Sequence, residues 1–357
     1  MVQLPPEVYS AIAAYVHTRD LLTLARTTKA LQRAAEPRIY ENVMLRDAQS
    51  AYHGCHSIMM RDGLRASYVK RFVLYQDQRR SGPRNNLAAV PVQFWLTIQL
   101  ALTMTVNLDA LIIWDPLIRH SWILDHEQIR FQLREANIRL PWDAHVVEFL
   151  QKQDKLQALN ACESNEDGPL CPLPPAALGA LESFSGPVLV VAELLGCPLT
   201  RLQILLDDDT APILPTVVGD LGKIMKGLRS LSVIGMPGSL LMDTVQLVST
   251  SVFASNLRYL GVLPLPSTES SALNRCLMNM HALEVLEVDV TRWEPQPPEW
   301  MHRPVLLGFR IYAPSLQQVI FWIGPTRVSW YLSHDGDWQS VRHMGRAPGN
   351  DGFWRSF

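Results

Sequence analysis

Histidine and cysteine side chains come closest together at residues 53–56, where His53, Cys55 and His56 could offer ligands to a zinc ion. A tetrahedral structural zinc site needs four such ligands, usually supplied as two pairs. The sequence has no convincing second pair nearby. We therefore expect these residues to be an incidental cluster on a helix, with no metal bound.

Other stretches begin like catalytic or ion-binding motifs, and each lacks a required residue. His126-Glu127 opens like a metalloprotease helix, but Arg130 stands where the second histidine is needed. Gly222-Lys223 ends like a phosphate-binding loop, but Val217 stands where its first glycine belongs. Residues 333–337, Ser-His-Asp-Gly-Asp, have too few oxygen ligands in order for a calcium loop. The sequence therefore predicts a protein that is not an enzyme, with no cofactor.

Composition narrows the class of protein further. With 357 residues, 48% of them hydrophobic, the chain can bury a large core. A net charge of −2 gives no electrostatic footprint for nucleic acid or an anionic membrane, so neither is expected as a partner. The most apolar stretch, Val90–Val106, contains five glutamine and threonine residues and is predicted to be a buried amphipathic helix.

Compartment is indicated by the start of the chain and by its cysteines. The first residues lack a basic stretch followed by an apolar one, so no secretory signal is predicted. Five irregularly spaced cysteines are then expected to be reduced thiols. These features favour a cytoplasmic or nuclear location.

The first 46 residues predict three short helices. Leu4, Val8, Ile12 and Val16 recur every four residues, as the apolar stripe of a helix does. Thr18 or Asp20 can cap a second helix, and Thr28 a third that ends at Pro37. Three helices of this size cannot bury all their apolar surface among themselves, so something else must cover it.

The same residues resemble the F-box, the motif by which substrate receptors bind the Skp-type adaptor of Skp–cullin–F-box ubiquitin ligases. The resemblance lies in Leu4-Pro5-Pro6-Glu7, the helix end at Ile12 and Tyr15-Val16, Asp20-Leu21-Leu22, Lys29-Ala30-Leu31 and the closing Glu36-Pro37-Arg38-Ile39-Tyr40 with Val43. Ala13 and Ala14 depart from it, because many F-boxes have larger apolar residues there. The resemblance implies that the adaptor would contact Leu4, Pro5, Val8, Ile12, Leu21, Leu22 and Leu31. The alternative is a three-helix cap on the rest of the chain.

A loose repeat follows, with apolar residues at positions i, i+3 and i+5. Its instances are Val69/Phe72/Leu74, Leu108/Leu111/Ile113, Leu156/Leu159/Ala161, Leu178/Leu181/Ser183, Leu199/Leu202/Ile204, Leu228/Leu231/Val233, Leu257/Leu260/Val262, Leu283/Leu286/Val288 and Leu316/Val319/Phe321. The spacing approaches that of leucine-rich repeats in the C-terminal half, and the N-terminal gaps require insertions. Helical patterns between the units, such as Pro91–Met104, predict strand–helix repeats.

Repeats of this kind predict an α/β fold. We expect an N-terminal three-helix F-box at residues 1–46 and an irregular leucine-rich-repeat solenoid at 47–340, with parallel strands on the concave face and helices on the convex face. A loosely ordered tail is expected at 341–357, whose Phe353 and Trp354 could fold back onto the last repeat. The chain as a whole resembles fungal F-box proteins with leucine-rich repeats. A compact α/β domain with a parallel sheet is the alternative.

The register of the repeat also predicts a partner-binding surface. In most units the residue after the third apolar position, which should face away from the helices, is itself bulky and apolar. This candidate stripe comprises Tyr75, Trp114, Phe184, Leu205, Ile234, Leu263 and Trp322. Either it is an exposed groove for a protein, or loops fold over it and make it ordinary core.

The sequence leaves three alternatives for the function of the protein. The resemblance implies a non-catalytic receptor that binds a Skp-type adaptor, and through it a cullin-RING ligase, while its repeats hold an unknown target protein. A leucine-rich scaffold without a ligase is the second reading. An α/β enzyme is the third, and a deep pocket lined by histidines and carboxylates would favour it.

Overall fold

The computed structural model describes residues 4–77, 79, 86–162, 170–266, 270–295, 299–344 and 352–357. Its contacts divide the chain into two compact units, unit 1 at Met1–Leu178 and unit 2 at Gly179–Phe357. Both units are α/β, which confirms the predicted class. The division falls at Leu178, so the N-terminal helices belong to the same compact unit as the strands that follow them.

Unit 1 begins with three helices, α1 (Pro6–Tyr15), α2 (Leu21–Ala25) and α3 (Lys29–Glu41). Ala13, Leu21 and Ala35 form their small buried core. Thr28 caps α3 as predicted, because its hydroxyl accepts a hydrogen bond from the Leu31 main-chain N–H.

The predicted end of the third helix at Pro37 is wrong, since α3 continues to Glu41. Proline removes one main-chain hydrogen bond and crowds the preceding turn. Contacts on both sides of it hold the helix together. The Glu36 carboxylate pairs with Arg61 and Arg65 at 2.9 and 3.0 Å, and the Tyr40 hydroxyl bonds Ser57 at 2.6 Å.

A parallel sheet follows the helices in unit 1, and its strands lie in sequence order. The strands are β1 (Asn42–Leu45), β2 (Arg71–Leu74), β3 (Ala110–Trp114), β4 (Glu135–Arg139) and β5 (Ala158–Ala161). The connecting segments contain α4 (Ala48–Met59), α5 (Val92–Met104) and α6 (Ala144–Gln151). The long gap between Leu111 and Leu159 holds a repeat that the sequence pattern missed, because its second apolar position is the small Ala136, preceded by the buried Leu133.

Helix α5 confirms the predicted helix but not its predicted burial. Phe94, Trp95 and Ile98 are buried, whereas Val92 and Leu100 on another face are 56% and 51% exposed. The helix is apolar on both faces, so periodicity could not indicate which one is inside. Across the part of the chain that the structure describes, no helix combines the length and the apolarity needed to cross a membrane.

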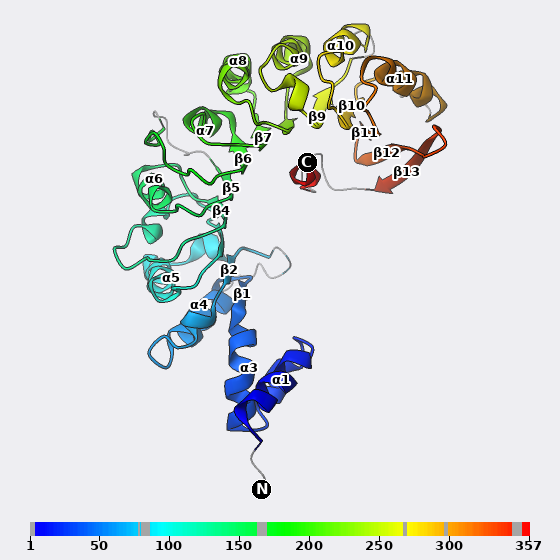
Figure 1. Cartoon of the computed structure of the whole chain (residues 1–357). Coiled ribbons are helices and arrows are strands. Elements are labelled where there is room, and N and C mark those ends of the chain that lie inside the picture. The colour runs from blue at the N-terminus through cyan, green and yellow to red at the C-terminus, as the bar shows by residue number, and fades with distance from the viewer. Residues whose placement is uncertain are drawn as a thin grey trace. The chain divides into compact units, whose positions relative to one another are not determined.

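Unit 2 repeats the strand–helix alternation more regularly. Its parallel strands are β6 (Ser183–Pro187), β7 (Arg201–Leu205), β8 (Ser230–Ile234), β9 (Tyr259–Pro264), β10 (Val285–Asp289) and β11 (Gln318–Ile323). The helices are α7 (Val188–Glu193), α8 (Leu214–Ile224), α9 (Leu241–Ser249), α10 (Ser270–Leu277) and α11 (Glu299–Tyr312). They lie along one side of the strands (Figure 1).

Burial in unit 2 explains why these residues form strands. Leu228, Leu231 and Val233 are at most 1% exposed, as the i, i+3, i+5 pattern predicts for the side that faces the helices. Each strand start also bonds to the preceding repeat: the Arg258 N–H donates to Arg229, and the Glu284 N–H donates to Arg258. The backbone is therefore satisfied from one repeat to the next.

The end of unit 2 differs from the expected loose tail. Arg327–Leu332 belong to β12 (Thr326–Leu332), and β13 (Trp338–Met344) pairs with β12 in antiparallel fashion. Residues 341–344 therefore belong to a strand. Residues 352–357, called segment 352–357 below, include a helical turn at Phe353–Ser356 with Trp354 1% exposed. The rest of the expected tail, 345–351, lies outside the described residues.

Candidate protein-interaction surfaces

The histidine–cysteine cluster does not assemble a metal site. On α4, His53 and His56 are exposed, while Cys55 is fully buried on another face. Burial raises the pKa of the Cys55 thiol to about 12, so it is protonated at neutral pH and is a poor metal ligand. Among the described residues, no group of three or more histidine, cysteine or acidic side chains could hold a metal ion.

A buried carboxylate in unit 1 escaped the sequence analysis. Asp115 is fully buried and accepts main-chain N–H bonds from Leu117, Arg119 and His120, and its Oδ2 lies 2.9 Å from the His120 ring. The His120 ring stacks on Trp95. These contacts fix the loop after β3, because a buried acid must be hydrogen-bonded to be tolerated. We assign the pair a structural role.

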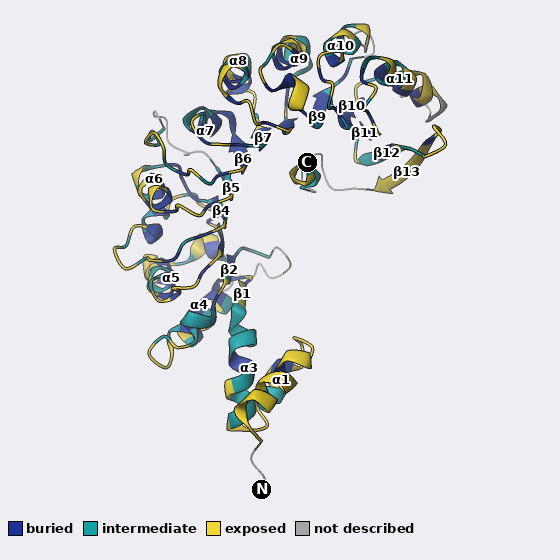
Figure 2. Ribbon diagram, viewed as in Figure 1, coloured by how far each residue is buried: buried dark blue, intermediate teal, exposed yellow. Residues whose placement is uncertain are grey.

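The exposed apolar side chains of α1 and α2 form the first candidate surface, called the α1–α2 surface below. Leu4, Val8 and Ile12 are 44%, 38% and 37% exposed, and Leu22 is 57% exposed. Much of α1 has the colour of exposed residues in Figure 2. Pro5 is also exposed, and Leu31 is half-buried. Tyr15, which is part of the F-box-like pattern but not one of the residues expected to contact the adaptor, is 93% exposed. The described part of the chain therefore leaves this apolar stripe uncovered.

Leu21 is the exception among the seven residues expected to contact an adaptor. Its side chain is 1% exposed and packs with Ala13 and Ala35 in the three-helix core. The expectation for Leu21 is therefore corrected: it positions the α1–α2 surface from beneath and does not present itself to a partner. Adjacent residues on one helix point in different directions, so Leu21 can pack in the core while Leu22 faces outward.

Arg38 of α3 holds the end of α1 in place. Its guanidinium donates to the main-chain oxygens of Ala14 and Val16 at 2.9 and 3.0 Å, and also to that of Ala13. These carbonyls stand at the C-terminal end of α1, where helical partners run out and positive charge is favoured. The link is between residues far apart in sequence, so no local pattern predicted it.

The second candidate surface is the inner face of unit 2, meaning the sheet face turned away from α7–α11. Strand pairing aligns its residues in rows across the sheet. The first row is Arg201, Ser230, Tyr259, Val285 and Gln318. Further along the strands the face includes Gln203, Ser232, Val262, Glu287, Ile320, Leu205, Ile234, Asp289 and Trp322.

The predicted stripe is not a continuous exposed surface. Trp114 and Leu205 are exposed, and Arg139 stacks over the Trp114 ring in unit 1. Tyr75 and Ile234 are half-buried. Phe184, Leu263 and Trp322 are each at most 2% exposed, which contradicts their expected availability to a partner.

Two of these errors are errors of register. Phe184 pairs with Leu202, so it occupies the second inward position of its repeat, and the sequence frame starting at Leu178 was three residues early. In β9 one extra residue lies between Leu260 and Leu263 relative to the neighbouring strand β10. This bulge turns Val262 to the inner face and Leu263 toward the helices, because side chains alternate along a strand.

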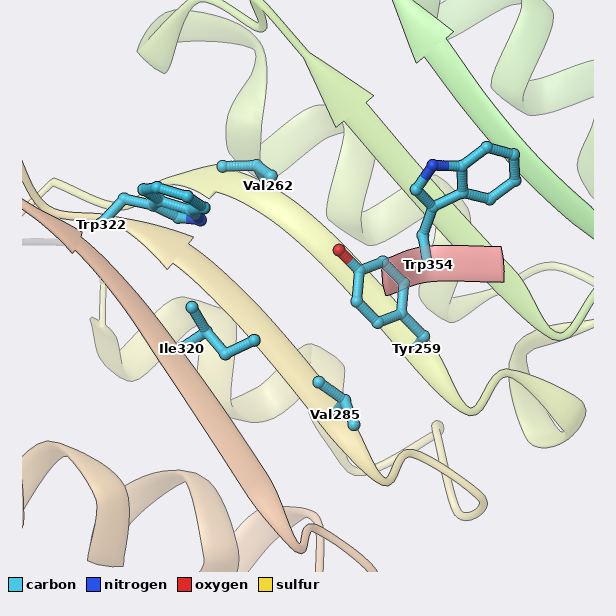
Figure 3. Packing of buried hydrophobic residues seen from close by; sticks show 6 residues of the cluster. All are labelled: Tyr259, Val262, Val285, Ile320, Trp322 and Trp354. Carbon is cyan, nitrogen blue, oxygen red and sulfur yellow. The ribbon is translucent and has the colours of Figure 1, made fainter. Parts of the chain in front are cut away.

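Trp322 does lie on the inner face, but it is covered. It belongs to a buried cluster with Tyr259, Val262, Val285, Ile320 and Trp354 (Figure 3). Ile234, Phe353 and Phe357 pack against this cluster. Thus segment 352–357 fulfils the expectation that Phe353 and Trp354 fold back, and it lies on the inner face of β7–β9 rather than over the end of the last repeat.

Polar groups cross the same face beside the apolar cluster. The Ser185 hydroxyl donates to Gln203 at 2.9 Å, and the Gln203 amide donates to Ser232 at 3.4 Å. The Tyr259 hydroxyl donates to the carboxylate of Glu287, which also lies 3.7 Å from Arg327. A Cβ on Gly261 would come within 2.5 Å of the Glu287 Cβ, so only glycine fits there.

A cavity of about 490 Å³ adjoins the cluster at the carboxyl ends of β8–β10. It is lined by Val262 of the cluster, by Ile234, which packs against the cluster, and by Asp208, Asp289 and Arg292. Of the described residues that line it, none is a histidine.

The α1–α2 surface and the inner face of unit 2 are the two features of the structure that bear most directly on function. No protein-family model and no curated protein matches this chain.

Proposed function

We propose that this protein is a non-catalytic receptor that binds a Skp-type adaptor through its α1–α2 surface and holds a target protein through unit 2. The observation that carries the proposal is the exposure of Leu4, Val8, Ile12 and Leu22. A helix cap that served only the fold would have these side chains packed against the rest of the chain. Apolar side chains repeated along a helix and left in water indicate a protein-binding surface.

In this proposal the repeats are those of a leucine-rich solenoid preceded by an F-box. The support is the single parallel strand in each repeat, its buried i, i+3, i+5 residues, and the helical return segments. The F-box part is supported by the sequence resemblance together with the three-helix core around Ala13, Leu21 and Ala35.

The contribution of such a receptor to ubiquitin transfer would be proximity. Joining a target and a ligase in one assembly raises the effective concentration of target lysines near the charged ubiquitin carrier. The receptor then needs no metal, cofactor or catalytic side chain. A cytoplasmic or nuclear location would suit this role.

Co-purification tests the proposal. Tagged protein expressed with a Skp-type adaptor and a cullin should retain both, whereas Leu4→Ala/Pro5→Ala/Leu22→Ala should lose both, because the α1–α2 surface is reduced. A matched control is Met301→Ala/Leu307→Ala/Ile311→Ala on α11, whose side chains are 41%, 56% and 75% exposed. This control should retain the adaptor. Failure of the wild type to retain the adaptor would overturn the proposal.

A further inference from the structure

We propose that segment 352–357 is an intramolecular ligand of the inner face of unit 2, and that this face takes from the target protein a peptide with the same aromatic spacing. The spacing is that of Phe353, Trp354 and Phe357, with aromatic residues at i, i+1 and i+4. The inference rests on the proposed role of unit 2 in holding a target, and it names the chemistry of that target.

Segment 352–357 contacts the sheet as a ligand would. It is a helical turn, and strand side chains join it to β7 and β8. The Arg201 Nε donates to the main-chain oxygen of Phe357 at 2.5 Å, and the Ser230 hydroxyl donates to that of Trp354 at 2.7 Å. Both bonds go to main-chain oxygens, which any peptide in this position could supply.

Aromatic contacts make the site occupied by segment 352–357 specific for aromatic side chains. The Phe357 ring stacks on Tyr259 at 5.4 Å between centroids, and the Phe353 ring meets Tyr259 edge-on at 6.1 Å. The Arg327 guanidinium lies 5.0 Å from the Phe353 ring. Trp354 is 1% exposed within the apolar cluster shown in Figure 3. Aromatic rings buried against a rigid sheet are typical anchors of a peptide interface.

The inner face also has hydrogen-bonding capacity beyond what segment 352–357 uses. Among the residues that the structure describes, none is a hydrogen-bond partner of the buried Gln318 Nε2, Trp322 Nε1 or Ser329 Oγ. Pairing in β11 and β12 places these side chains on the inner face, in register with Val285, Asp289 and Ile320. A buried polar group without a partner costs about 1–3 kcal/mol. A longer peptide whose carbonyl oxygens reach these donors would recover part of that cost.

The free energy recovered by pairing these donors explains how a target peptide could displace segment 352–357. An intramolecular ligand competes at an effective concentration of about millimolar. A target must therefore bind more tightly, and the unpaired donors offer it additional contacts. The adjoining cavity, lined by Asp208 and Asp289 near Val262, offers space for a further side chain.

The test uses a fluorescent peptide with the sequence Gly-Phe-Trp-Arg-Ser-Phe and two versions of the full chain. In Phe353→Ala/Trp354→Ala/Phe357→Ala the competing rings are gone, so this variant should bind the peptide at least about tenfold more tightly than wild type in fluorescence anisotropy. Adding Arg201→Gln and Ser230→Ala to this variant should reverse the gain. A peptide with alanine at the three aromatic positions should not bind.

Equal affinity of the triple variant and the wild type, or equal binding of the alanine peptide, would overturn the inference. If the triple variant does not fold, hydrogen exchange on the wild type replaces it. Excess peptide should then raise exchange several-fold in fragments spanning β13 and segment 352–357, and unchanged exchange would refute displacement. No adaptor is present in these assays, so their failure leaves adaptor binding by the α1–α2 surface standing.

Discussion

Single residues in this protein differ sharply in what they contribute, because the same chemical group is buried in one place and hydrated in another. Glu36 and Glu284 both accept from arginine, but the Glu36 side chain is 5% exposed and that of Glu284 is 28% exposed. Glu36 also joins α3 to two arginines beyond α4. Burial therefore decides which ion pair stabilises the fold.

Glu36→Ala should lower the free energy of unfolding by about 3 kcal/mol, because it leaves the largely buried Arg65 without its carboxylate. Glu284→Ala, which breaks the more exposed pair with Arg258, should cost about 0.5 kcal/mol. Urea denaturation of the two variants measures both. Equal costs would contradict the account.

The buried thiols give a pH dependence. Burial raises the pKa of Cys55 to about 12 and that of Cys197 to about 11, from an ordinary value of 9.0. Above pH 9 the unfolded thiol loses its proton while the folded thiol keeps it, so stability falls as pH rises. For each thiol the expected slope is about 1.4 kcal/mol per pH unit, up to its folded pKa.

Denaturation between pH 8 and 11 tests this dependence. Cys55→Ala should show a shallower loss of stability than wild type over that range. Leu205→Ala, which removes no titrating group, is the control and should show the pH slope of the wild type. A Cys55→Ala slope identical to that of wild type would show that the thiol ionises freely in the folded protein.

At the scale of elements, the repeat pattern predicted strands of unit 2 such as β8, and failed on where side chains point. The pattern Leu228/Leu231/Val233 gave β8 because each apolar residue is large and buried. The pattern missed β4 because its second apolar position is Ala136, and a small residue contributes little to an apolar pattern. The bulge in β9 reversed Leu263, because one inserted residue flips every later side chain.

Leu263 and Leu205 test the corrected register. Leu263→Ala should cost about 2–5 kcal/mol, because its side chain is 1% exposed and its removal leaves a cavity. Leu205→Ala, at a position 36% exposed, should cost less than about 1 kcal/mol. The partner-binding stripe predicted from the sequence places both leucines at equivalent positions. Similar losses of unfolding free energy in chemical denaturation would therefore support that stripe and contradict the corrected register.

Arg38 connects helix geometry with binding. Arg38→Met removes the donors to Ala14 and Val16 and should cost about 1.5–3 kcal/mol of stability. Because α1 then loses its fixed position, adaptor binding should weaken about tenfold or more. Arg33→Met, at an exposed position on the same helix, should change neither. Loss of stability with unchanged adaptor affinity would show that the Arg38 hydrogen bonds do not support adaptor binding by the α1–α2 surface.

At the scale of the whole molecule, each unit carries one surface, and the two were predictable to different extents. The α1–α2 surface follows from a local period of four residues, which the sequence shows directly. The inner face of unit 2 depends on Arg201 and Ser230 meeting segment 352–357, contacts that join residues more than a hundred positions apart. No local pattern encodes such contacts. The sequence therefore left the candidate stripe as either an exposed groove or a surface under loops, and did not indicate that segment 352–357 covers part of it.

The central claim is that the α1–α2 surface binds a Skp-type adaptor, and isothermal titration of purified adaptor into the full chain tests it most directly. We predict stoichiometric binding by the wild type, a loss of at least about 2 kcal/mol in Leu22→Glu, and no loss in Ile311→Glu, an exposed apolar position on α11. No measurable binding by the wild type, or equal affinity of Leu22→Glu and the wild type, would contradict the claim.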